Sequence, residues 1–150
     1  MTDHFLTRHE LLRPADAAAA VIVLDDRRYL LQLRDQKPGI FYPGHWGLFG
    51  GAIDANETPE MALFRELREE IGLEIDEARL LTEFSFTFGR HGRIQRYFYE
   101  VSIRAEVIPE LRLREGAEMR AFSASDILTR LRVVPYDSFA IWLHASNVLL

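Results

Sequence analysis

The chain has 150 residues, of which 48% are hydrophobic and 27% are charged, a composition typical of a globular protein with a sizeable core. Its 18 basic and 23 acidic residues give a net charge of −5, which argues against a general binder of nucleic acid or anionic membranes. The absence of cysteine excludes a disulfide framework, a thiolate zinc site and a cysteine nucleophile.

The N-terminal residues 1–14 carry charges throughout and have no apolar core of the kind found in signal peptides. The longest apolar stretch, residues 17–24, is far too short to span a bilayer. We therefore expect one domain over residues 1–150, located in the cytoplasm and not associated with a membrane.

The first third of the chain predicts short strands separated by turns. Residues 17–24 are typical of a buried strand, and the polar turn at 25–28 joins them to a second apolar run at 29–33 in an expected hairpin. Residues 35–45 contain two Pro-Gly pairs and predict a loop. Residues 46–53 are expected to form a short strand or turn region.

The clearest expected element is a helix over residues 58–72. Thr58 can cap its N-terminus, Pro59 occupies the position where proline is favoured, and Gly72 ends it.

Further elements are expected along the rest of the chain, and Asp137 is expected to cap the last of them after a break at Pro135. They are strands at 80–88, 95–103 and 119–122, a short helix at 126–130 capped by Ser123 or Ser125, and a C-terminal helix at 138–146. Strands joined mostly as hairpins, with helices between and after them, predict an α/β sandwich with a mixed β-sheet.

The expected helix places Glu66, Glu69 and Glu70 on one side, opposite the apolar Leu63, Leu67 and Ile71. Carboxylates at this spacing repel one another, and a divalent cation would offset the repulsion. Carboxylate oxygens suit Mg²⁺ or Mn²⁺ better than zinc. The alternative is a solvated acidic face without a ligand.

The spacing around this helix resembles a known signature. Gly51, then Glu57, then the run from Arg65 to Leu73 matches every constrained position of the Nudix box of the Nudix hydrolases. The resemblance implies an α/β/α sandwich with a mixed sheet. It also implies hydrolysis of a nucleoside diphosphate linked to another group, with water attacking phosphorus.

The resemblance assigns roles by position. It implies that Glu66, Glu69 and Glu70, together with the carbonyl of Gly50, bind Mg²⁺ or Mn²⁺, and that Glu57 and Arg65 orient these ligands. In some members of the family the general base lies outside the box. Here Glu118 is the first choice and Glu115 the second, against the alternative that both lie in a solvated loop. The proline common before the box is replaced here by Phe49.

The substrate is not determined by the box. The expected substrate-binding residues are basic or aromatic, namely Arg34, Phe41, Trp46, Arg90 and Arg96. The alternatives are that the aromatic residues belong to the core and that the basic ones belong to a solvated turn. The expected substrate is a nucleoside triphosphate or a nucleotide sugar.

The expected partner is therefore a small molecule and not polymeric nucleic acid, and the size and charge also disfavour an RNA-cap hydrolase. Two questions stay open. A non-catalytic nucleotide-binding module would share the fold, although no carboxylate of the box is missing here. A homodimer is compatible with the resemblance, since many relatives are dimers.

Overall fold

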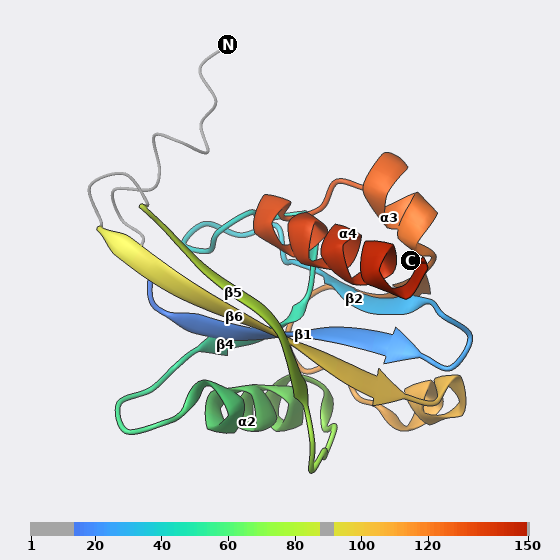
Figure 1. The fold of residues 1–150 in the computed structure, drawn as a ribbon, viewed down its shortest axis with the longest axis horizontal. Coiled ribbons are helices and arrows are strands. Elements are labelled where there is room, and N and C mark those ends of the chain that lie inside the picture. Colours follow the sequence, from blue (N-terminus) through green and yellow to red (C-terminus); the bar gives the residue numbers. More distant parts are fainter. Residues whose placement is uncertain (1–13, 88–91, 150) are drawn as a thin grey trace.

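The computed structural model describes residues 14–87 and 92–149, and its described residues contain a seven-stranded mixed sheet (Figure 1). The strands are β1 (Ala17–Leu24), β2 (Tyr29–Leu33), β3 (Trp46–Gly47), β4 (Phe49–Ala52), β5 (Arg79–Thr87), β6 (Arg93–Ile103) and β7 (Glu118–Phe122). The helices are α2 (Pro59–Ile71), the 3₁₀ helix η3 (Ala105–Glu110), α3 (Ala124–Thr129) and α4 (Pro135–Leu149).

The sheet is built around β1. Its main path runs β3-β2-β1-β6-β5, while β4 also pairs with β1 and β7 with β2. The expected hairpin is present, with β1 antiparallel to β2, and β1 runs parallel to β6 along its whole length. Both faces of β1 are buried, which explains its continuous apolar sequence. The predicted mixed sheet is confirmed.

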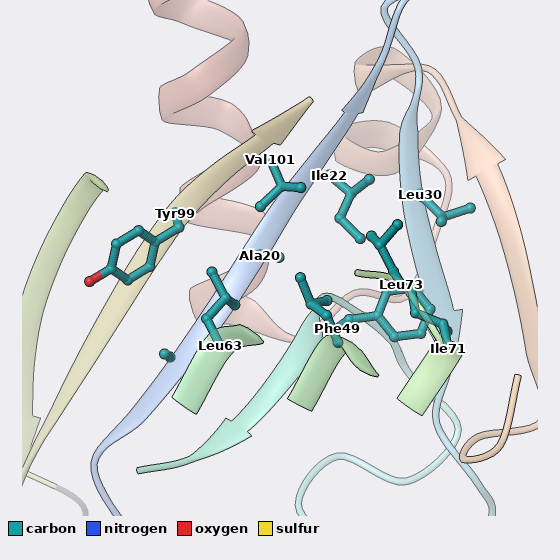
Figure 2. Packing of buried hydrophobic residues seen from close by; sticks show 11 residues of the cluster. Ala20, Ile22, Leu30, Phe49, Leu63, Ile71, Leu73, Tyr99 and Val101 are labelled. Atoms are coloured by element: carbon teal, nitrogen blue, oxygen red, sulfur yellow. The ribbon is translucent and has the colours of Figure 1, made fainter. Parts of the chain in front are cut away.

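Helices cover the two faces of the sheet, as Figure 1 shows. On one face, Leu63, Leu67 and Ile71 of α2 pack against alternate residues of β1 (Figure 2). On the other face, Ile127 of α3 and Ile141 of α4 pack against the intervening residues of the same strand. The predicted α/β/α sandwich is therefore confirmed. No helix within the described parts of the chain is long and apolar enough to cross a membrane.

Local chemistry sets the ends of α2 as predicted. The Thr58 hydroxyl accepts a hydrogen bond from the Met61 N–H at 3.1 Å, and Pro59 is the first helical residue. At the other end Gly72 adopts φ +67°, a left-handed conformation that favours glycine, and its N–H donates to the Arg68 carbonyl.

The C-terminal helix differs from its prediction. Pro135 does not break the chain but begins α4, because the fixed φ of proline suits a first helical turn that needs no N–H donor. Asp137 consequently lies inside the first turn and does not cap the helix. Its carboxylate accepts a hydrogen bond from the Leu48 N–H at 3.0 Å.

Smaller differences concern other element bounds. β6 begins at Arg93 rather than 95, and the helix η3 at Ala105–Glu110 was not expected, since its sequence lacks an apolar repeat. Phe88, expected at the end of a strand, lies outside the described residues. The short helix α3 is capped by Ser123, whose hydroxyl accepts from the Asp126 N–H.

Candidate active site

A cleft of about 500 Å³ opens where β4, α2 and the start of α4 meet the loop after β2. Seven of the residues expected to have a function line it: Arg34, Phe41, Gly50, Glu66, Glu69, Glu70 and Arg96. Glu115, the second choice for a general base, also lines it. Residues from distant parts of the sequence therefore meet in one cavity.

Two glycines allow close packing of β4 at this cleft. Gly50 has φ +144°, and a Cβ atom there would lie 2.2 Å from the Ala18 carbonyl oxygen of β1. A Cβ atom on Gly51 would lie 2.5 Å from the carboxyl group of Glu66. Only glycine leaves room for these contacts. Gly50 lets β4 lie close to the backbone of β1, and Gly51 lets the Glu66 carboxylate of α2 lie directly against the backbone of β4.

Glu70 is the most buried carboxylate of the motif. The residue is only 5% exposed, and its Oε2 accepts a hydrogen bond from the Gly50 N–H at 3.0 Å. Burial raises the pKa of Glu70 to about 8, and the nearby negative charges of Glu66 and Glu115 contribute to the rise. The protein thus keeps an acidic group in a place that disfavours its ionised form unless a cation is near.

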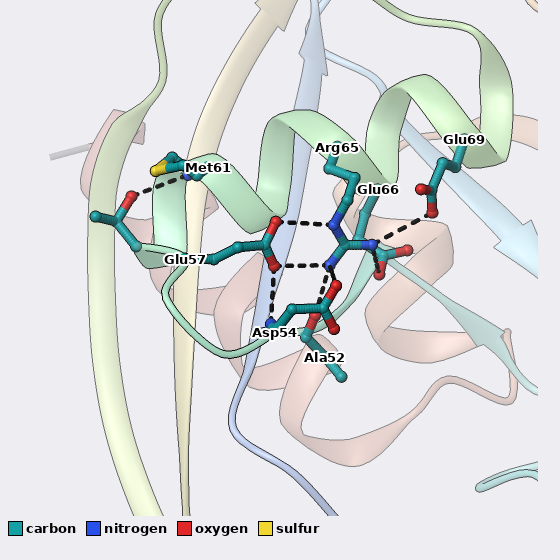
Figure 3. A network of polar contacts seen from close by, with 8 residues as sticks. Ala52, Asp54, Glu57, Met61, Arg65, Glu66 and Glu69 are labelled. Carbon is teal, nitrogen blue, oxygen red and sulfur yellow. Dashed lines mark hydrogen bonds and ion pairs between the residues drawn. The ribbon is translucent and has the colours of Figure 1, made fainter.

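Arg65 holds the other side of the motif together (Figure 3). Its guanidinium donates to both oxygens of Glu57 at 2.8 and 3.0 Å, to the Ala52 carbonyl at 2.9 Å and to Glu66 at 2.9 Å. It also donates to Glu69 at 3.3 Å. Hydrogen bonding to Arg65 lowers the pKa of Glu57.

Opposing effects act on the pKa of Glu66. Burial raises its pKa, and the charges of Glu69 and Glu115 add to that effect, while Arg65 acts against it. The side chain is 14% exposed, compared with 59% for Glu69. Glu66 is therefore a largely desolvated carboxylate whose positive partner is Arg65, whereas Glu69 faces solvent at the rim of the cleft.

The donor set fits a hard divalent cation. Three carboxylates and the backbone of Gly50 border one cleft, and two of the carboxylates have raised pKa values that a positive charge would reverse. In the described residues no three acidic or imidazole side chains converge into a ready-made coordination sphere. Arg65 engages Glu66 and Glu69 instead, and the Gly50 N–H engages Glu70.

The two candidate bases occupy different surroundings. Glu115 lies in the loop before β7 and lines the cleft, where its charge acts on Glu66 and Glu70. Glu118 begins β7, forms an ion pair with Arg120 and is not among the residues that line the cleft. The structure therefore brings the second choice, and not the first, to the other carboxylates.

Only some of the expected substrate-binding residues are found in the cleft. Arg34 lines the cleft and donates from Nε to the Phe41 carbonyl at 2.7 Å, which ties the loop to β2. Trp46 does not line the cleft, because its ring packs edge-on against Phe122 at 4.8 Å in the core beside α3 and α4. This placement matches the core alternative for Trp46. Arg90 lies outside the described residues.

The lining residues that were not anticipated include Tyr136 and Asp137 at the start of α4. Asp137 is 4% exposed, and Arg96 lies 3.8 Å from it and 4.2 Å from the centre of the Tyr136 ring. An acidic residue near the start of a helix is usually an N-cap. Nothing in the sequence therefore indicated that Asp137 lines the cleft.

Comparison with known proteins agrees with the fold. The NUDIX domain family matches residues 14–143. The chain belongs to the Nudix family. The Nudix box recognised in the sequence is thus the part of the fold that runs from β4 through α2.

Individual relatives are similar over shorter segments. The nucleoside triphosphatase NudI of Escherichia coli O139:H28 is 40% identical over 77 residues, which is 51% of either chain. The 8-oxo-dGTP diphosphatase of Proteus vulgaris is 47% identical over 45 residues, 30% of this chain and 40% of that protein. The chain therefore spans about half the length, or less, of the curated relatives it matches.

A solved structure shows the same fold. The MutT protein from Methanosarcina mazei Go1 superposes with a TM-score of 0.74 over 89% of this chain and 94% of that one, at 19% identity.

Proposed function

We propose that this Nudix protein hydrolyses the phosphoric anhydride of a nucleoside diphosphate linked to another group, with a nucleoside triphosphate as the foremost substrate. The observation that carries the proposal is the buried Glu70, which shares one cleft with Glu66, Glu69 and the cationic Arg34 and Arg96. The names of the two curated relatives favour a triphosphate over a nucleotide sugar.

The residues that would hold Mg²⁺ or Mn²⁺ are Glu66, Glu69, Glu70 and the carbonyl of Gly50. When bound, such ions neutralise the diphosphate, polarise its P–O bonds and lower the pKa of a coordinated water. The raised pKa values of Glu66 and Glu70 support this assignment, because both groups gain most from a nearby positive charge.

The chain's own groups position the reactants. Arg65 and Glu57 fix one side of the carboxylate cluster through charge-assisted hydrogen bonds. Arg34 and Arg96 lie where they can meet the phosphates or the base of the substrate. We assign to Glu115, which lines the same cleft, the role of accepting the proton of the water that attacks phosphorus, while the P–O bond to the leaving phosphate group breaks.

A substrate panel tests the proposal. Nucleoside triphosphates, nucleotide sugars, ADP-ribose and dinucleoside polyphosphates would be assayed with Mg²⁺, with Mn²⁺ and with a chelator. We expect metal-dependent turnover of triphosphates and a loss of about 100-fold or more in the Glu69→Gln and Glu70→Gln variants.

Glu74→Gln is the matched control, because Glu74 follows α2 and pairs with Arg68 on the exposed surface. It should keep wild-type activity. If no diphosphate is cleaved with either metal, the protein is a non-catalytic nucleotide-binding module. If both Gln variants stay fully active, the metal assignment is wrong.

A further inference from the structure

Gln32 is a buried polar residue of β2 in the wall of the cleft. The residue is 4% exposed, and its Nε2 donates to the Leu48 carbonyl at 3.2 Å. Burying an amide is costly unless its polar atoms are hydrogen-bonded, whereas an apolar side chain in a sheet has no such requirement. Core packing alone therefore does not explain a glutamine at this position.

The amide oxygen of Gln32 lies against the loop before β7. A Cβ atom on Gly116 would lie 2.8 Å from Gln32 Oε1 and 3.0 Å from the Leu33 carbonyl oxygen, and Gly116 has φ +92°. Glycine suits both the left-handed φ and the close approach. One side chain thus contacts two backbone segments, Leu48 after β3 and Gly116 before β7.

Backbone hydrogen bonds tie this loop to two other elements. The Arg114 N–H donates to the Glu70 carbonyl of α2 at 2.8 Å, and the Ala117 N–H donates to the Leu33 carbonyl of β2 at 2.8 Å. Glu115 lies between these two bonds and lines the cleft. The placement of its carboxylate relative to α2 therefore depends on how closely the loop approaches β2.

The other contact of Gln32 leads to the acidic cluster of α2. Its acceptor, the Leu48 carbonyl, lies two residues before Gly50, whose N–H donates to Glu70. Gln32 is thus bound to the same short stretch of backbone that Glu70 contacts. The charge of Glu115 contributes to the raised pKa of Glu70, so the two carboxylates are near enough to interact.

We propose that Gln32 is a positioning residue, which holds the carboxylate of Glu115 beside those of α2 through its contact with Gly116. This inference rests on the proposed function, in which Glu115 accepts the proton of the attacking water. Misplacing a reacting group by about 1 Å can cost about 100-fold in rate. Loss of the Gln32 amide should therefore lower kcat much more than it changes KM.

The first test is Gln32→Met, which keeps the length of the side chain and removes the amide. We expect kcat for a nucleoside triphosphate to fall by about tenfold or more, with KM within about twofold of the wild type. Gln95→Met is the matched control, because Gln95 is a half-buried glutamine of β6 that does not line the cleft. A raised KM with unchanged kcat would make Gln32 a substrate-binding residue and overturn the inference.

A double variant distinguishes a positioning role from a purely structural one. If Gln32 acts through Glu115, the variant with both Gln32→Met and Glu115→Gln should have the kcat of Glu115→Gln alone, within about twofold. A structural defect would instead multiply the two losses. Multiplied losses would therefore contradict the inference.

Gly116→Ala disturbs the same contact from the loop and should give the same split between kcat and KM. Its control is Gly92→Ala, since Gly92 has a similar φ of +82° and a Cβ atom there would have no neighbour within 4 Å. Equal activity of these two variants would show that the contact with Gln32 has no role. If Gln32→Met fails to fold, Gly116→Ala and its double variant with Glu115→Gln decide the matter.

The binding of Mn²⁺ alone, measured by calorimetry, separates this inference from the proposed function. Glu115→Gln removes a negative charge near the cluster and should weaken Mn²⁺ binding by about threefold or more. Gln32→Met should weaken it similarly, and the double variant no further. If no diphosphate is hydrolysed but these changes are seen, the proposed function fails and the positioning role stands. Unchanged affinity in either single variant, or a wild type that binds no Mn²⁺, overturns the inference.

Discussion

Glu70 and Asp137 come from helices on opposite faces of the sheet, yet both bind the same short stretch of backbone. Glu70 accepts the N–H of Gly50 and Asp137 accepts the N–H of Leu48, two residues earlier. In an extended chain these N–H groups lie about 7 Å apart. The segment from Leu48 to Gly50 therefore sets the separation between the acidic cluster and the Arg96–Asp137 pair.

Glu70 should make the metal-free protein sensitive to high pH. Its pKa of about 8 in the folded protein exceeds the ordinary value of 4.5, so the unfolded chain releases this proton first as the pH rises. Stability from this group is complete at low pH and is lost as the pH rises through about 8. Glu70→Gln should therefore raise the free energy of unfolding at pH 9, by up to about 5 kcal/mol, and have little effect at pH 4.

Urea unfolding with a chelator at several pH values measures this difference. The same variant should lose hydrolytic activity, so stability and function change in opposite directions at one residue. Glu74→Gln, on the exposed surface, should leave both unchanged. An equal effect of Glu70→Gln at pH 4 and pH 9 would contradict the assignment of a raised pKa.

The two glycines of the motif should respond differently to alanine. In Gly51→Ala the atoms nearest to the new methyl group are at the end of the Glu66 side chain, which can move, so we expect folded protein with at least a tenfold loss of kcat/KM. In Gly50→Ala the methyl group meets the backbone of β1 and φ is +144°, so we expect a loss of several kcal/mol in stability. Thermal unfolding and steady-state kinetics on both variants separate the two roles, and equal melting temperatures would refute the distinction.

Replacing Arg65, even by lysine, should lower both activity and stability. Its fork binds both oxygens of Glu57 and reaches Glu66 and the Ala52 carbonyl, a geometry that one ammonium group cannot reproduce. Arg65→Lys should lower kcat/KM by about tenfold or more and reduce stability by about 1–3 kcal/mol.

The matched control for this prediction is Arg68→Lys, since Arg68 is exposed on the same helix and forms an ion pair with Glu74. It should change stability by less than about 0.5 kcal/mol, as expected for a surface pair. Kinetics and urea unfolding of the two variants side by side provide the measurement. Equal losses in both would show that helix content, and not the arginine fork, is responsible.

Sequence periodicity was sufficient for the elements with strong local signals. The ends of α2 follow from Thr58, Pro59 and Gly72, which act within one helical turn. Asp137 could not be placed, because its direction depends on how α4 packs against Leu48, which lies between β3 and β4 and 89 residues earlier in the sequence. The placement of Trp46 also depends on tertiary packing. An aromatic side chain in a short strand can pack in the core or line a cleft, and here it packs against Phe122.

The choice of general base is the last prediction, and the structure favours Glu115 over Glu118. Glu115 lines the cleft with Glu66 and Glu70, whereas Glu118 pairs with Arg120 outside it. We expect Glu115→Gln to lower kcat by 10²–10⁴-fold, the usual contribution of a general base, with a smaller change in KM. Glu118→Gln is the matched control and should leave kcat within about twofold, because it removes only an exposed ion pair. Steady-state kinetics of the two variants side by side provide the measurement. The reverse pattern would restore Glu118 as the base, and an unchanged kcat in both would assign proton transfer to a carboxylate of α2.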